Sequence, residues 1–200
     1  MRTIICCLIL LVHATAMACP PFVPPQSGGD YNDPDARQRL DTVERFHFTA
    51  RVEKLLQGES GYLGGDIGYT LEHFANHPRA LASMAKLALR EKTPKPRGAG
   101  YSVDCYFDRA IRFRPEDARV RAVFGAWLLA NQKEAAALEQ LQEAARLAPD
   151  NAANHYNLGL LYLRRKDYDR AREAAQEAYA MGFPLPGLRS KLQAAGKWQE

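Results

Sequence analysis

The second half of the chain repeats itself with a period of 34 residues. Gly125 returns as Gly159, and Ala137 returns as Ala171. Further pairs at this interval are Ala144 and Ala178, Phe124 and Leu158, and Leu128 and Tyr162. Self-similarity at a fixed period of this size is typical of proteins built from stacked copies of one small structural unit. Such stacks are binding scaffolds far more readily than enzymes, because they present extended surfaces.

The repeated small residues suit the crossings of two antiparallel helices. A larger side chain at such a crossing would push the helices apart and lose packed area. We expect Gly125 and Gly159 on the first helix of each unit, and Ala137 and Ala171 on the second. The bulky residues that fill the space between the helices are Phe124, Leu128, Leu141, Leu158 and Tyr162.

Pro149 marks the boundary between the two units. A helix over residues 139–148 must end before it, because proline cannot continue the helical hydrogen bonding. Asp150 or Asn151 then suits the N-cap of the next helix. The stretch 154–162, followed by 167–171, closely resembles a consensus unit of the tetratricopeptide repeat (TPR) family. The resemblance implies an all-α, TPR-like right-handed helical solenoid.

The resemblance is clear over residues 118–184 and weakens toward the N-terminus. Ala110 and Pro115 fit the second helix of an earlier repeat, whose first helix is predicted over 80–90. Between these helices, Lys92–Ser102 is rich in lysine, proline and glycine, which predicts an inserted loop. We therefore expect about three repeats over residues 76–184.

Further helices are predicted on both sides of the repeats. Residues 67–74 form a flanking helix within an N-terminal helical and extended segment, 36–75. Pro184 and Pro186 end the repeat pattern. Residues 185–200 then supply a short capping helix, over 188–195, and a tail, since a solenoid must cover its open end.

The N-terminus carries the pattern of a secretory signal over residues 1–18. Arg2 precedes an apolar run over 4–12, and small residues follow up to Ala18. The run is too short to span a bilayer. Residues 19–35 are rich in proline and glycine, which predicts an extended tether. The chain is therefore expected in the periplasm or outside the cell.

Cys19 has two alternative roles. It directly follows the predicted cleavage site, as does the lipidated cysteine of a bacterial lipoprotein, although Ala16 and Met17 depart from the usual lipobox residues. It could instead form a disulfide with Cys105 in an oxidising compartment. A lipid anchor would tether the protein to the outer membrane, and no other membrane contact is expected.

The charge balance gives little support to nucleic-acid binding. The formal net charge is +4, with basic and acidic residues well mixed. The region from Lys95 to Arg121 is denser in basic residues, which leaves open an anion-binding patch beside the plainer interpretation of a solvated face. A glycan or small anionic ligand is therefore the alternative to a protein partner.

Few residues suggest an enzyme or a cofactor. His73 and His77 share a helix face, but a third metal ligand is missing nearby, so no metal site is predicted. The glycine-rich stretch 61–68 lacks the Lys-Ser/Thr of a phosphate loop, and tight turns with Asp66 as an N-cap explain it better. His47 lies in a segment with period-two alternation, predicted to be extended. We expect neither catalysis nor a cofactor.

The TPR resemblance implies that the first helix of each repeat lines a concave groove, where another polypeptide binds as an extended or helical segment. Carried over by register, the candidate contact residues are Arg79, Lys86, Arg90, Tyr156, Asn157, Leu160 and Arg164. The basic residues at one end favour a partner with carboxylates next to hydrophobic anchors. The sequence therefore predicts a non-enzymatic scaffold of the bacterial envelope that helps assemble or position a larger complex.

Overall fold

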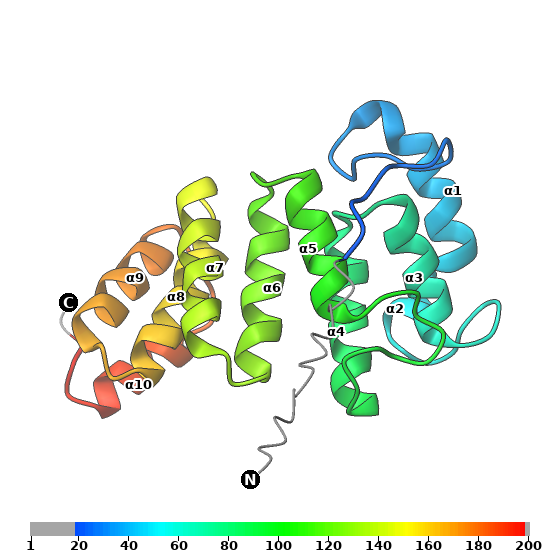
Figure 1. Ribbon diagram of the computed structural model, residues 1–200. Coiled ribbons are helices and arrows are strands. Elements are labelled where there is room, and N and C mark those ends of the chain that lie inside the picture. The colour runs from blue at the N-terminus through cyan, green and yellow to red at the C-terminus, as the bar shows by residue number, and fades with distance from the viewer. Residues whose placement is uncertain (1–18, 199–200) are drawn as a thin grey trace, which may run out of the picture.

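The computed structural model describes residues 19–198, and all the regular secondary structure in this part of the chain is helical. The predicted signal over 1–18 lies outside the described residues. The helices follow one another in a row from α1 to α9, with α10 folded under the far end (Figure 1). They are α1 (Arg37–His47), α2 (Ala50–Glu53), α3 (Leu63–His73), α4 (Pro78–Glu91), α5 (Val103–Phe113), α6 (Ala118–Ala130), α7 (Glu134–Leu147), α8 (Ala152–Arg164), α9 (Tyr168–Ala180) and α10 (Gly187–Ala194), with a short 3₁₀ turn at Pro34–Ala36.

The two clear repeats are the helix pairs α6–α7 and α8–α9, and their small residues lie at the crossings. A Cβ placed on Gly125 would lie 2.7 Å from Leu141 Cγ on the partner helix. Ala137 and Ala171 are completely buried. The helices approach closely at these points, so each repeat needs a small residue at the same place. This accounts for the recurrence of small residues every 34 positions.

Both repeats turn between their helices in the same way. Gln132 and Lys166, which lie 34 residues apart, both adopt the left-handed conformation, with φ of 62° and 60°. In the equivalent bonds, Lys133 N donates to Leu128 O and Asp167 N to Tyr162 O. The repeat unit thus conserves its turn geometry without a glycine.

The earlier repeat is the pair α4–α5, and the predicted loop over 92–102 lies between them. This loop packs against the first turns of α3. A Cβ on Gly64 would meet Arg97 O of the loop at 2.5 Å, and one on Gly68 would meet Tyr106 Oη of α5 at 2.8 Å. Gly64 and Gly68 therefore serve close packing, and three of the four glycines of 61–68 lie inside α3 instead of in turns.

Two local predictions for the N-terminal segment are wrong. His47 belongs to α1 and is not extended, because α1 uses a helical apolar face with Leu40 and Val43 buried. Asp66 is not an N-cap: α3 begins three residues earlier, and Tyr62 occupies the cap position. Instead, the fully buried Asp66 carboxylate accepts hydrogen bonds from residues of the preceding loop, at Glu59 N and Ser60 N.

Residues 19–35 lie against the helices and are not a free tether. A disulfide joins Cys19 to Cys105 at the start of α5, with the two Cα atoms 5.5 Å apart. Further along, Asp30 accepts a hydrogen bond from Arg114 Nε at 2.5 Å. Asn32 Nδ2 donates to Asp117 at 2.8 Å. These contacts are side-chain specific, so composition alone could not show them.

The helix α10 covers the C-terminal end of the stack. Its own Leu188 and Leu192 are completely buried against the stack. A Cβ on Gly159 would lie 2.6 Å from Leu188 Cδ2, so the cap packs directly against the glycine face of α8. Trp198 packs edge-on against Tyr179, with ring centroids 6.0 Å apart.

Candidate functional site

The first helices of the three repeats, α4, α6 and α8, line a shared groove of about 340 Å³. We call this surface the groove. Its lining residues are Pro78, Arg79, Ala82, Arg119, Ala122, Val123, Asn151, Ala153, Asn154 and Asn157. All of them lie in the caps or early turns of the three helices, so the groove crosses the stack at one level.

Equivalent caps start the three helices at this level. The N-cap side chains of His77, Asp117 and Asn151 each accept a hydrogen bond from an amide of the following turn. His77 directly precedes a proline, and Asp117 and Asn151 each follow one by two residues. The cap and the nearby proline together fix where each helix begins. The chain thereby brings small residues such as Ala122 and Ala153 to the groove wall, where a partner backbone can approach closely.

Arg79 supplies one positive charge of the groove and is held by the N-terminal helices. Its guanidinium pairs with Glu44 of α1 at 2.6 Å and with Glu53 of α2 at 3.2 Å. Although partial burial opposes it, the hydrogen bond to Glu44 raises the pKa of Arg79. About half of the side chain remains exposed, 45%, so it can still contact a ligand.

Arg119 supplies the second positive charge. Its guanidinium donates to Asn32 Oδ1 and lies over the Tyr31 ring, 5.3 Å from its centroid. The carboxylate of Asp117 is 3.9 Å away. Both groove arginines are thus oriented by residues 31–53, outside the repeats. The repeat pattern carries no signal for these non-local contacts.

The structure brings only some of the predicted contact residues into the groove. Arg79 and Asn157 line it, and Asn157 is exposed. Lys86 is exposed further along α4. Arg90 donates to Leu55 O at 2.7 Å, so a segment of the chain itself lies beside this position. Arg164 pairs with Glu134 of α7 at 2.6 Å.

Tyr156 and Leu160 point toward the packed interior. Tyr156 is buried, and its ring stacks on Phe183 with centroids 4.2 Å apart. Leu160 is half-buried and packs against the core. Register alone placed Tyr156 in the groove. In the last repeat, however, the turn after α9 folds back over this position.

The histidines singled out from the sequence have structural partners. His77 is completely buried; its Nδ1 accepts from Ala80 N at 3.1 Å, and its Nε2 lies 2.9 Å from Glu44. His47 Nδ1 bonds the Asp66 carboxylate at 3.1 Å. Within residues 19–198 the structure has no cluster of three side chains suited to a metal. In the same residues, no helix is long and apolar enough to cross a membrane.

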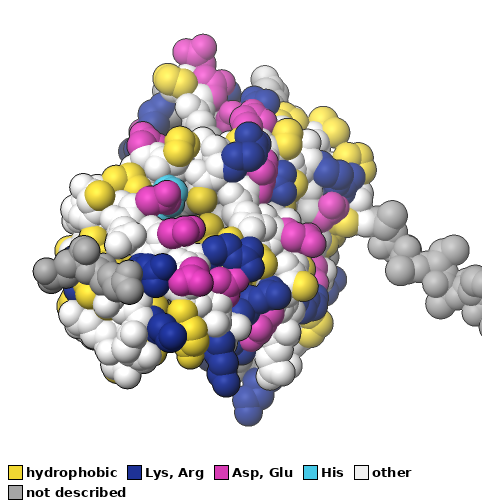
Figure 2. Space-filling model, turned by 90° about the vertical axis from the view of Figure 1, so that its left-hand side faces the viewer, with side chains coloured by type: hydrophobic (Ala, Val, Ile, Leu, Met, Phe, Trp, Pro, Cys, Tyr) yellow, Lys and Arg dark blue, Asp and Glu magenta, His cyan; other side chains and the backbone are white. Residues whose placement is uncertain are grey.

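Charges are interleaved over the end of the molecule formed by α9 and α10. Figure 2, which faces this end, shows lysine and arginine side chains beside aspartate and glutamate. Local pairs such as Arg172 with Asp169, at 3.0 Å, account for part of this pattern. This end thus offers no large surface of a single sign.

Comparisons with known proteins identify the fold. A family model described as tetratricopeptide repeat matches residues 141–173. PilF of Pseudomonas aeruginosa superposes with a TM-score of 0.56 at 20% identity, covering 78% of this chain and 67% of that one. The chain is a TPR protein. Its fold is that of a scaffold for protein–protein interaction, since TPR solenoids present extended binding surfaces.

Other similar proteins agree with this assignment. The MamA protein superposes on this TPR chain with a TM-score of 0.55 at 16% identity, covering 78% of this chain and 82% of the other. YrrB, a TPR protein with an unusual peptide-binding site, gives 0.51 at 18% identity, covering 82% and 76%. The TPR repeat-containing thioredoxin TTL4 of Arabidopsis thaliana is 30% identical over 139 residues, or 66% of this chain. The match spans only 20% of TTL4.

Proposed function

We propose that this TPR protein is a non-enzymatic scaffold of the bacterial cell envelope that holds an acidic, extended segment of another polypeptide in the groove. Through this contact it helps assemble or position a larger periplasmic or outer-membrane complex. The observation that carries the proposal is the groove itself, where two half-exposed guanidiniums flank a wall of small side chains.

The chemistry of the groove selects the kind of segment. Arg79 and Arg119 favour carboxylate side chains, which can accept charge-assisted hydrogen bonds from a guanidinium. Asn157 can bond a backbone amide, since an asparagine side chain both donates and accepts. Ala122 and Val123 leave room for a main chain to lie close. A peptide-binding site is also named for YrrB, whose fold is similar.

The compartment is proposed from the N-terminus. The secretory pattern of residues 1–18 and the disulfide between Cys19 and Cys105 both favour an oxidising compartment. A lipid anchor would need the Cys19 sulfur that the disulfide uses, so the proposed form is periplasmic without an anchor.

Adding negative charge to the groove should weaken binding of the partner. We expect the double substitution Ala122→Glu with Asn157→Glu to weaken binding at least about tenfold, because two carboxylates would face an acidic segment. Neither side chain has a structural hydrogen bond to lose among the contacts described. The measurement is capture of envelope proteins on the purified chain, with Glu173→Lys on the exposed side of α9 as the matched control.

A discrete protein bound by the wild type and the control, and lost with the double variant, is the result expected. Equal capture by all three chains would contradict the groove proposal. Binding that instead follows acidic polysaccharide and salt would favour the glycan alternative.

A further inference from the structure

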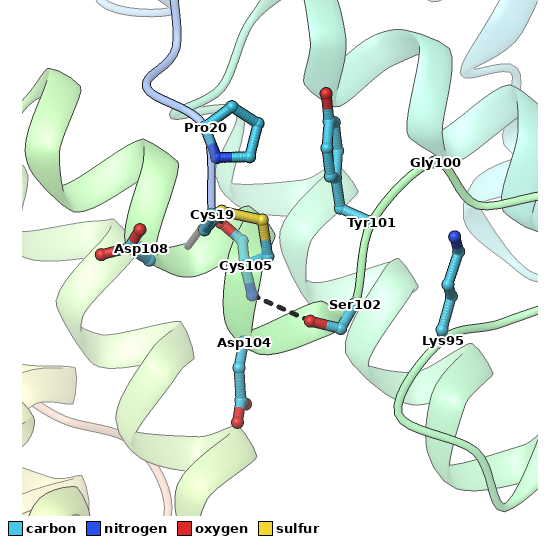
Figure 3. Close-up of a pocket in the computed structure, with 9 residues that line it drawn as sticks. All are labelled: Cys19, Pro20, Lys95, Gly100, Tyr101, Ser102, Asp104, Cys105 and Asp108. Atoms are coloured by element: carbon cyan, nitrogen blue, oxygen red, sulfur yellow. Dashed lines mark hydrogen bonds between the residues drawn. A yellow bond between two sulfur atoms is a disulfide. The ribbon is translucent and has the colours of Figure 1, made fainter. Parts of the chain in front are cut away.

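The disulfide lies at the edge of an open cleft. A cleft of about 690 Å³ lies between the first turns of α5 and the loop over 92–102, and Figure 3 shows the residues that line it. Both Cys19 and Cys105 are partly exposed. Thiol–disulfide exchange requires a thiolate to reach one of the two sulfur atoms. A disulfide that lines a solvent-filled cleft meets this requirement in the folded protein.

Cys105 is the better leaving group of the two sulfurs. It lies in the first turn of α5, where its amide donates to the N-cap Ser102 Oγ at 3.3 Å. The partial positive charge at a helix N-terminus stabilises a thiolate. A thiolate that leaves easily directs the attack to the other sulfur, that of Cys19.

Two carboxylates near Cys105 oppose this effect, but both have cationic or donor partners. Asp104 accepts from Trp127 Nε1 at 2.5 Å and from Lys133 Nζ at 3.0 Å. Asp108 pairs with Arg112 at 2.6 Å. Their negative charge is therefore partly compensated, and the helix N-terminus keeps its influence on the sulfur.

On the other side of the disulfide, the chain over 19–27 has few anchors. Arg112 donates to Cys19 O at 2.8 Å. Phe22 packs edge-on against Phe113, with ring centroids 4.8 Å apart. Val23 is 77% exposed. We call residues 19–27 the strap.

Arg109 lies beneath the strap, where its guanidinium is 5.6 Å from the Phe22 ring centroid and 4.5 Å from that of Tyr101. Its side chain is buried, it donates to Pro20 O at 3.3 Å, and its Nε has no hydrogen-bond partner. A buried, incompletely bonded guanidinium costs free energy. Release of the strap would return the guanidinium to water, which offsets part of the loss of its contacts with Pro20 and Phe22.

Beyond the strap, the chain is held independently of the disulfide. Gly29 N donates to His73 O at 2.9 Å. Asp30 pairs with Arg114 and accepts from Asn76. Any release that follows loss of the disulfide should therefore stop near Gly28.

We propose that the Cys19–Cys105 disulfide is a thiol–disulfide exchange site for a dithiol reductant, and that its reduction frees the strap while the solenoid stays folded. A thiolate of the dithiol attacks Cys19 Sγ, the S–S bond breaks, and Cys105 leaves as a thiolate. The second thiolate of the dithiol then attacks the reagent sulfur that is bonded to Cys19, and Cys19 leaves as a thiolate. The dithiol loses two electrons and becomes a disulfide, the protein disulfide gains them, and the two protons of the dithiol end on Cys19 and Cys105.

The first test follows reduction of the purified protein by dithiothreitol. The rate of thiol appearance should be linear in dithiothreitol concentration and should rise about tenfold per pH unit below the pKa of the reagent, because the thiolate is the attacking species. A rate that levels off at the rate of global unfolding would overturn the proposal, since the sulfurs would then react only in the unfolded chain.

The second test measures release of the strap by chymotrypsin cleavage after Phe22, which is 8% exposed in the disulfide form. Cleavage should be at least about tenfold faster after reduction, because a released segment is open to protease. Cys19→Ser should be cut as fast as the reduced wild type with or without reductant. Equal cleavage of the oxidised and reduced wild type, or loss of helical circular dichroism on reduction, would contradict the proposal. Neither test involves the partner of the groove.

Discussion

Gly159→Leu should lower the free energy of unfolding by about 3 kcal/mol, through overpacking where α8 crosses its neighbours. The first added carbon would lie 2.6 Å from Leu188 Cδ2 and 3.4 Å from Ala171 O, so the Leu188 side chain would have to shift, and the rest of the leucine would press on α9 and α10. Leucine has a better helix propensity than glycine by less than about 1 kcal/mol. That gain is too small to offset the clash.

The measurement is chemical denaturation followed by circular dichroism. Ala126→Leu is the matched control, because it adds the same kind of side chain at an exposed position of α6. The control should change stability by less than about 0.5 kcal/mol. An unchanged midpoint for Gly159→Leu would mean that this glycine is not at a helix crossing.

His77→Ala should also cost about 3 kcal/mol. The substitution removes the N-cap acceptor for Ala80 N, worth about 1 kcal/mol. It also removes the hydrogen bond to Glu44 and leaves a cavity at a completely buried position, and together these losses cost a few kcal/mol. His77→Asn should recover part of the loss, because asparagine keeps an N-cap acceptor. Denaturation of the three proteins tests this order, and equal stabilities would contradict it.

The same contacts predict a dependence of stability on pH. Burial lowers the pKa of His77 below its usual 6.5. The folded protein then binds fewer protons than the unfolded chain, so stability present above pH 6.5 falls as the pH drops below it. The hydrogen bond from His77, with Arg79, lowers the pKa of Glu44 to about 2. The contribution of Glu44 to the free energy of unfolding is present above pH 4.5 and is lost as the pH falls toward 2.

His77→Asn should therefore show a flatter loss of stability between pH 7.5 and 5 than the wild type. The free energies of unfolding at these two values give the comparison. Parallel slopes for the two proteins would show that another group causes the acid sensitivity.

The repeats could be predicted from the sequence because their contacts recur at a fixed interval. Gly159 and Ala171 show both the crossing and the register, since each has a counterpart 34 residues earlier. The loop over 92–102 was also visible, because its composition interrupts this pattern. Local chemistry repeated along the chain is information that a single sequence contains.

The N-terminal contacts could not be predicted in this way. Asn32 meets Arg119 across 87 residues, and Glu44 meets Arg79 across 35. No periodicity relates these pairs, and each depends on how residues 19–53 fold back over the stack. Tyr156 is a similar case, because its burial depends on the turn that contains Phe183, which stacks on its ring.

The groove is tested most directly by photocrosslinking in cells from a reactive side chain placed at Ala122, compared with one at the exposed Glu173. Mass spectrometry of the product identifies the crosslinked segment of the partner. The account predicts one acidic segment joined to position 122, with little or no product from 173. Products from 173 alone, or the same set of proteins from both positions, would contradict a partner bound in the groove.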